Sequence, residues 1–169
     1  VIQMKKPLLD VEDLHVAFGA KTVVDGVGLT IAAGEKLALV GESGSGKTVT
    51  ALALLRLLHD ARVTGRARFD DGRQVRDLLA LPERALQALR GDDIAMIFQE
   101  PMTALNPLMT VGEQIAEVVR LKKALTPAQA AQAAIELLAK TGIPEPARRA
   151  GAYPHQLSGG QRQRVMIAM

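Results

Sequence analysis

GESGSGKT, residues 41–48, is the stretch that decides the fold of this 169-residue chain. It fits the pattern G-x-x-x-x-G-K-[ST], in which successive backbone N–H groups converge on the phosphates of ATP or GTP. The flanking sequence agrees, because residues 36–40 form an apolar run typical of a buried parallel strand and residues 49–58 carry apolar positions suited to a helix. The sequence therefore predicts a strand, a phosphate-binding glycine loop and a helix.

The residue types in this loop explain the chemistry. Its glycines permit backbone angles and a close approach that a side chain would prevent. Lys47 can reach the β- and γ-phosphates, and the hydroxyl of Thr48 can ligate Mg²⁺. The positive end of the following helix supports the same anion. We therefore expect a nucleoside triphosphate with Mg²⁺ as the ligand, and this loop alone does not choose between ATP and GTP.

LSGGQ, residues 157–161, forms a second motif near the end of the sequence. Ser158 is a good N-cap residue, and Gly159 and Gly160 beside it leave backbone N–H groups uncovered. This pattern is compatible with an ordinary capped helix. In a chain that already carries a phosphate loop, it also predicts a second anion site at a helix start.

Together the two motifs resemble the ATP-binding cassette (ABC) family, whose signature is LSGGQ, and the resemblance covers nearly the whole chain. In that family two cassettes pair head to tail, with ATP between one phosphate loop and the signature of the other cassette. The resemblance implies catalytic roles for Lys47 and Gln99, and Mg²⁺ ligation by Thr48 and Gln99. The implied nucleotide contacts are Phe18, Gly41, Glu42, Ser43, Gly44, Ser45, Gly46, Lys47, Thr48, Gln99, Ser158, Gly159, Gly160 and Gln161.

Two of these positions lie outside the motifs. Gln99 follows the mostly apolar segment 93–98, which reads as a strand, and its placement is similar to that of the family's Q-loop glutamine. Phe18 follows an alternating segment, at the place where the family puts an aromatic ring against adenine. Because the chain has only three Phe and one Tyr, a role of Phe18 in the core is the alternative.

The family resemblance implies an α/β fold: a P-loop NTPase core with a mostly parallel sheet, a small antiparallel β subdomain and an inserted α-helical subdomain. We expect one incomplete cassette domain over residues 1–169, with about 1–100 and 156–169 in the nucleotide-binding core and about 101–155 in the helical subdomain. Alternation over residues 8–33, and a strand over 63–69 before the turn at 70–72, predict the antiparallel part. Helices are expected over 82–89, from Thr110 and from Thr126.

The chain is similar to the ATPase subunits of bacterial peptide and nickel importers, including the microcin-uptake type, at residues 41–47, 96–102 and 106–107 and in YPHQ at 153–156. That resemblance implies a subunit that couples ATP binding and hydrolysis to solute import, with peptide as the expected solute. Its implied partners are transmembrane permease subunits, a second cassette and, indirectly, a periplasmic solute-binding protein. Its implied location is peripheral, on the cytoplasmic face of the bacterial inner membrane.

The composition limits the alternatives. No apolar stretch approaches the ~20 residues of a membrane span. The net charge is +3, but only 2% of residues are aromatic and the arginines are dispersed, so we expect no nucleic-acid partner. The sequence has no cysteine, and His15, His59 and His155 show no metal-ligand spacing.

Family members continue beyond the signature helix into a strand ending in Asp-Glu and then a histidine, which complete Mg²⁺ binding and activate water. This chain ends at Met169, so we expect its C-terminal part of the cassette to be absent and the chain alone to be inactive or nearly so. The alternatives are a chromosome-maintenance or DNA-repair ATPase of the same superfamily and a non-hydrolysing nucleotide-binding fragment. The first is disfavoured because residues 100–156 hold no heptads and no cysteine.

Overall fold

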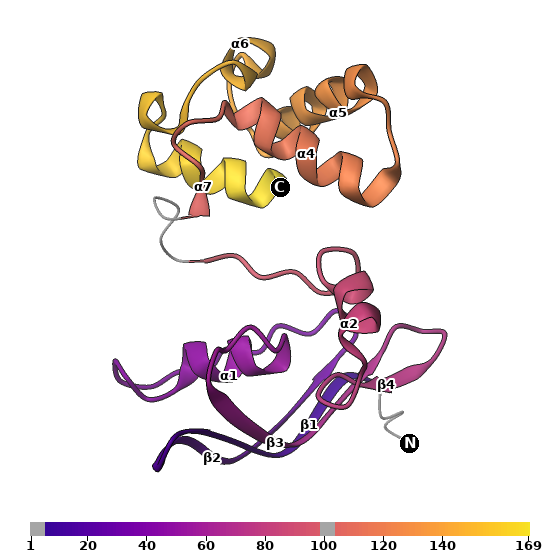
Figure 1. Cartoon of the computed structure of the whole chain (residues 1–169), viewed down its shortest axis with the longest axis vertical. Helices are drawn as coiled ribbons and strands as arrows, with labels where there is room; N and C mark the ends of the chain where they lie inside the picture. The colour runs from indigo at the N-terminus through magenta and orange to yellow at the C-terminus, as the bar shows by residue number, and fades with distance from the viewer. Residues whose placement is uncertain (1–5, 99–103) are drawn as a thin grey trace. The chain divides into compact units, whose positions relative to one another are not determined.

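A computed structural model of the chain describes residues 6–98 and 104–169. The chain divides into two compact units, Val1–Ile94 and Ala95–Met169. The first unit holds the sheet and the phosphate loop, and the second is helical (Figure 1). No helix in the described ranges has the length and apolar character of a membrane span.

The first unit is built on a four-stranded antiparallel sheet with strand order β2-β1-β3-β4. Its strands are β1 (Pro7–Phe18), β2 (Lys21–Ala32), β3 (Ala61–Asp70) and β4 (Val75–Asp77). The alternating pattern over residues 8–33 and the turn after β3 are therefore confirmed. Helices α1 (Lys47–Leu54) and α2 (Glu83–Leu89) complete this unit, and α1 packs against β1 and β2 (Figure 1).

Register irregularities bend the long hairpin of β1 and β2 and its pairing with β3. Between Glu12 and His15, the pairing of β1 with β3 shifts. Gly65 of β3 makes this shift possible, because a Cβ there would lie 2.4 Å from the carbonyl oxygen of Asp13 and the residue has φ +111°. A side chain at this position would collide with backbone, so the two strands approach as closely as they do only with glycine.

Alternating strand residues and one helix face supply the core of the first unit. The members are buried apolar side chains whose exposed fractions are all 6% or less: Val11, Leu14, Val16, Val24, Ala53, Ala67, Phe69, Leu78, Leu86 and Leu89. Because Ala53 lies on α1 and Leu86 and Leu89 lie on α2, both helices are held to the sheet by apolar burial.

The second unit consists of helices α4 (Val111–Lys123), α5 (Pro127–Lys140), α6 (Pro146–Ala150) and α7 (Gly159–Ala168), with a 3₁₀ turn at Pro154–Gln156. Both α4 and α5 begin where the sequence predicts, and capping boxes form at Thr110 and at Thr126. The small-residue face of α5 is buried, since Ala130, Ala134 and Leu138 are all 0% exposed. The signature helix α7 packs against α4 and α5 within this unit. Its expected grouping with the nucleotide-binding core stays a prediction.

Two predicted strands are not formed. Residues 36–40 and 93–98 lie outside any strand, although one isolated parallel bridge joins Arg90 to Ile94. Their apolar side chains are partly exposed, with Val40 at 85% and Ile97 at 52%. A strand needs neighbours to pair its N–H and C=O groups, and no described strand pairs with these segments. The helix predicted over 49–58 is also shorter than expected, because α1 ends at Leu54.

Candidate nucleotide-binding site

The glycine loop of residues 41–46 leads directly into α1, whose first residue is Lys47. Gly46 is the N-cap, with φ +87° and ψ 0°. A Cβ at Gly46 would lie 2.9 Å from the carbonyl oxygen of Val23 and 3.3 Å from Cγ2 of Val24. The loop backbone thus lies against β2, and only glycine allows this approach together with a left-handed backbone.

The side chain of Lys47 turns back across the loop. Its Nζ donates hydrogen bonds to the carbonyl oxygens of Gly41 (2.8 Å) and Glu42 (2.6 Å) and to Oγ of Ser45 (3.1 Å). The backbone N–H of Ser45 also donates to the carbonyl oxygen of Glu42, at 3.2 Å. The lysine ammonium is therefore held within the loop, at the start of the helix.

The first turn of α1 is open to a ligand. No side chain caps it, and no acidic residue lies in it. The first N–H groups of a helix have no partner inside the helix, and the helix dipole places partial positive charge there. Thr50 is buried and donates its Oγ1 hydroxyl to the carbonyl oxygen of Gly46 at 3.0 Å, which fixes the helix start. Thr48 is exposed, so its hydroxyl is accessible to a metal ion.

The signature motif forms the second uncovered helix start. Ser158 and Gln161 make a reciprocal capping box: the N–H of Gln161 donates to Ser158 Oγ at 3.3 Å, and the N–H of Ser158 donates to Gln161 Oε1 at 3.0 Å. The N–H groups of Gly159 and Gly160 donate to no described residue. A Cβ at either glycine would meet nothing within 4 Å. These two N–H groups are therefore the accessible donors of the motif.

Burial and two arginines fix the direction of the signature helix. Leu157 and Val165 are buried at 3% and 0% exposed. Arg162 Nε donates to the carbonyl oxygen of Leu157 at 2.9 Å, and Arg164 Nη1 donates to that of Gly142 at 2.6 Å. Because Gly142 follows α5, the signature helix is bound to the end of its neighbour. The glycines at its start are thus presented on a fixed support.

Two predicted site residues, Phe18 and Gln99, lie outside the two helix starts. Phe18 is half-buried at the end of β1, where it pairs with Lys21 and Ala61 and packs against the core. Phe18 therefore contributes to the core of the first unit, and its stacking on adenine stays a prediction. Gln99 lies outside the described residues. No group of three or more His, Cys, Asp or Glu within 6–98 and 104–169 could hold a metal ion.

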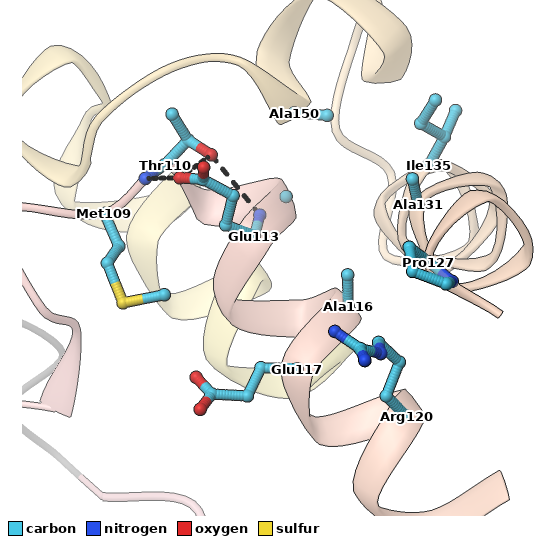
Figure 2. A pocket seen from close by; sticks show the side chains of 11 residues that line it. Met109, Thr110, Glu113, Ala116, Glu117, Arg120, Pro127, Ala131, Ile135 and Ala150 are labelled. Atoms are coloured by element: carbon cyan, nitrogen blue, oxygen red, sulfur yellow. Dashed lines mark hydrogen bonds between the residues drawn. The ribbon is translucent and has the colours of Figure 1, made fainter. Parts of the chain in front are cut away.

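A groove of about 530 Å³ lies between α4 and α5 in the helical unit (Figure 2). Apolar side chains such as Met109, Ala116 and Ile135 line it, with Glu117 and Arg120 of α4 at the side. Glu113 also borders it but is occupied by the capping box, where hydrogen bonds from Thr110 lower the pKa of its carboxyl group. The groove thus combines an apolar lining with charges of both signs.

Three residues that contact Gly46 of the phosphate loop were not predicted from the sequence. Val23 and Val24 contact the position of Gly46, and Thr50 binds its carbonyl oxygen. The alternating pattern of β2 marks apolar positions, but it carries no signal that one of them faces a glycine loop more than 15 residues later in the sequence.

The sequence and the fold of this chain are similar to those of known proteins. Residues 24–169 match the family model described as ABC transporter. The chain is 56% identical to the peptidoglycan transport ATP-binding protein YejF of Agrobacterium fabrum, over 97% of the chain and 31% of that protein. It is 49% identical to the oligopeptide transport ATP-binding protein OppD of Salmonella typhimurium, over 96% of the chain and 49% of that protein. A putative peptide import ATP-binding protein of Brucella abortus is 47% identical, over 98% of the chain and 51% of that protein.

The chain therefore spans about a third to a half of the length of these relatives.

Solved structures agree on the fold. A dimeric bacterial ABC transporter cassette matches with a TM-score of 0.77 and 29% identity, over 95% of this chain and 67% of that one. A dimeric cassette in a post-hydrolysis state, bound to ADP and Pi, matches with a TM-score of 0.74 and 27% identity over the same shares. The α/β P-loop NTPase fold predicted from the sequence is confirmed by these structures.

Proposed function

Because this chain belongs to the ABC transporter family, we propose that it forms the ATP-binding part of a subunit that drives solute import. In the proposed mechanism two cassettes close head to tail on ATP, and ATP hydrolysis releases them. A shared ligand that binds only the closed state shifts the population toward that state, and its cleavage reverses the shift. A chemical step is thereby converted into a movement that permease subunits can use.

One observation carries this proposal: a single chain presents two uncovered helix starts. One is the first turn of α1 after the glycine loop, and the other is the pair of N–H groups at Gly159 and Gly160. Each is a half-site of N–H donors suited to phosphate oxygens. In a head-to-tail pair, the loop of one copy and the signature of the other would face the same γ-phosphate. The dimeric cassettes among the similar structures support this arrangement.

Within each site, we assign Lys47 to the β- and γ-phosphates. The capping box occupies the side chains of Ser158 and Gln161, so these residues would shape the signature surface while the glycine N–H groups bind the γ-phosphate. Thr48 and Gln99 would hold Mg²⁺, which neutralises phosphate charge when it is bound. The accessible hydroxyl of Thr48 beside Lys47 fits that ion.

Peptides are the proposed solute class. Support comes from the names of the relatives, among them an oligopeptide transport protein and putative peptide importers. These names also favour an importer over the chromosome-maintenance alternative. The proposed location is the cytoplasmic face of the bacterial inner membrane, with a periplasmic solute-binding protein as the indirect partner.

The groove between α4 and α5 is the surface that we assign to the permease subunits (Figure 2). Its apolar lining suits a helix of a membrane subunit, and Glu117 and Arg120 can select the charges that flank such a helix. The groove lies in the same unit as the signature helix. A shift of that unit on ATP binding would therefore reach the bound permease.

A complementation experiment tests the head-to-tail site. Lys47→Met removes the phosphate-binding ammonium. Gly160→Glu places a carboxylate where a Cβ meets open space, and an acid in the first turn favours the helix while it repels phosphate. Each variant alone has two damaged sites in a dimer. When the two variants are mixed, a dimer of one copy of each has one intact site, formed by the unchanged loop of the Gly160→Glu copy and the unchanged signature of the Lys47→Met copy.

Association in the presence of Mg²⁺ and a non-hydrolysable ATP analogue is measured by analytical ultracentrifugation. We expect dimers with the unchanged chain and with the mixture, but monomers with each variant alone. Gln132→Glu, an exposed charge change on α5, serves as the control and should dimerise normally. A mixture that stays monomeric, while the unchanged chain dimerises, contradicts the shared site.

The solute class is tested separately in cells. Uptake of a radiolabelled tripeptide should depend on the gene and should be lost when its Lys47 codon is changed to Met. Uptake that is equal with and without the intact codon would refute peptide import, even if ATP-dependent dimerisation were observed.

A further inference from the structure

The end of α1 that is remote from the phosphate loop has an unusual closure. The N–H of Leu57 donates to the carbonyl oxygen of Leu52, and that of Arg56 donates to Ala53, both at 2.9 Å. This is a Schellman closure, in which Arg56 takes the left-handed position with φ +50°. Glycine is the usual residue there, so the closure needs support from elsewhere.

Arg90 provides that support. Its Nε and Nη2 donate to the carbonyl oxygen of Leu55, at 2.8 Å and 2.6 Å, and Nη2 also lies 3.2 Å from that of Arg56. The planar fork of the guanidinium thus binds the chain at the last, negative end of α1. A cation at this end also complements the helix dipole. The Arg90 side chain is only 23% exposed, which reduces competition from water.

A carboxylate and a second arginine complete the cluster. Nη1 of Arg90 donates to Glu83 Oε1 at 2.6 Å, and Glu83 Oε2 lies 3.7 Å from Nη2 of Arg56. The Arg90 contact is the main reason why the pKa of Glu83 is lowered. Glu83 and Arg90 lie at the two ends of α2, which is itself anchored through buried Leu86 and Leu89. The clamp on α1 therefore rests on a helix fixed in the core.

We propose that Arg90 is a positioning residue for nucleotide binding, which aligns the phosphate-binding first turn of α1 by clamping the other end of the same helix. This inference rests on the proposed function of the glycine loop. Arg90 does not touch the loop; it acts through α1.

The short length of α1 sets the size of this effect. Its eight residues span about 12 Å. A tilt of about 5° at the clamped end therefore moves the first turn by about 1 Å. A misplacement of about 1 Å can cost about 100-fold in the rate of a catalysed step, and we expect a smaller loss, of about tenfold, in phosphate binding. The phosphate contacts should weaken, whereas contacts to adenine, for which Phe18 of β1 is the predicted residue, should not.

Three variants test the inference. Arg90→Met removes the fork but keeps a long apolar side chain, and Arg90→Lys keeps the charge without the planar geometry. Arg84→Met, at an exposed position of the same helix, is the matched control for loss of one positive charge. For each chain, the dissociation constants of MgATP and of AMP are measured by competition with a fluorescent ADP analogue. Urea unfolding is followed in parallel.

The decisive quantity is the ratio of the AMP constant to the MgATP constant. A change in the folded fraction alters both constants equally and leaves this ratio unchanged. We expect the ratio to fall about tenfold in Arg90→Met, to fall less in Arg90→Lys and to stay constant in Arg84→Met. An unchanged ratio in Arg90→Met overturns the positioning role while the nucleotide site stands. If the unchanged chain shows no preference for MgATP over AMP, the proposed function itself fails, and this inference fails with it.

Discussion

Substitution of Gly46 by alanine tests the packing of the phosphate loop most sharply. The residue has φ +87°, a conformation that costs a non-glycine residue about 1–2 kcal/mol. The added Cβ would also lie 2.9 Å from the carbonyl oxygen of Val23, a backbone atom of β2. Relief of that contact requires β2 or α1 to shift, at about 1–3 kcal/mol. We therefore expect Gly46→Ala to lower the free energy of unfolding by about 3 kcal/mol, as the sum of the two costs.

Gly44 is the matched control in the same loop. It has φ +83°, close to that of Gly46, but a Cβ there would meet nothing within 4 Å. Gly44→Ala therefore carries the conformational cost of about 1–2 kcal/mol without the collision. The difference between the two variants isolates the approach of the loop to β2.

Urea unfolding, fitted with a common slope, supplies the two free energies. Isothermal titration with a non-hydrolysable MgATP analogue shows whether the loop keeps its binding geometry. We expect weaker binding in Gly46→Ala than in Gly44→Ala, because a shift of α1 displaces the first turn. Equal destabilisation by the two substitutions would refute the argument that β2 supports the loop.

Three further predictions concern other parts of the chain. Thr110→Ala removes the capping box of α4 and should lower the free energy of unfolding by about 1 kcal/mol, measured by urea unfolding against an exposed control, Ala128→Ser. A hydrogen bond with Asp13 and the charge of Asp25 raise the pKa of His15 above 6.5, so its stabilising contribution is complete below pH 6.5 and lost as pH rises through the raised value. His15→Asn should therefore lower the melting temperature more at acidic than at alkaline pH. At alkaline pH the contact affected is the hydrogen bond from the Gly26 N–H to His15 Nδ1, at 3.2 Å. Equal losses at both pH values would contradict the ion-pair argument. The sequence-based expectation that residues 1–169 alone turn over little ATP stays a prediction, and a phosphate-release assay that shows clear turnover, absent in Lys47→Met, would refute it.

The helical unit could be predicted well from the sequence because its signals are local. Each helix start is indicated by residues within four positions of one another: Thr110 with Glu113, and Thr126 with Pro127. The structure has a capping box at both starts. Ser158 likewise begins the signature helix as its side chain predicts. The reciprocal hydrogen bond, from the Ser158 N–H to Gln161 Oε1, uses a side chain that resemblance to the family assigns to the nucleotide surface.

The sheet could be predicted only in part because pairing depends on distant residues. Alternation revealed β1 and β2, which pair with each other through a short hairpin. The apolar runs at 36–40 and 93–98 have the composition of strands but no pairing strand among the described residues. Composition cannot supply the missing hydrogen-bond partners. The end of α1 was missed for a different reason: its left-handed residue is Arg56, held by Arg90, where sequence rules look for glycine.

The candidate site, too, could be predicted from the sequence only in part. Residue types alone indicated Lys47 and the loop glycines, and the structure shows Lys47 held against the loop. Support from Val23, Thr50 and Arg90 depends on contacts between elements, which the linear sequence does not reveal.

A crystal structure with Mg²⁺ and a non-hydrolysable ATP analogue tests the central claim most directly. The account predicts one γ-phosphate within hydrogen-bond distance of Lys47 Nζ in one copy and of the N–H groups of Gly159 and Gly160 in a second copy. An analogue bound away from Lys47, or a γ-phosphate that contacts no glycine of a facing copy, would contradict it.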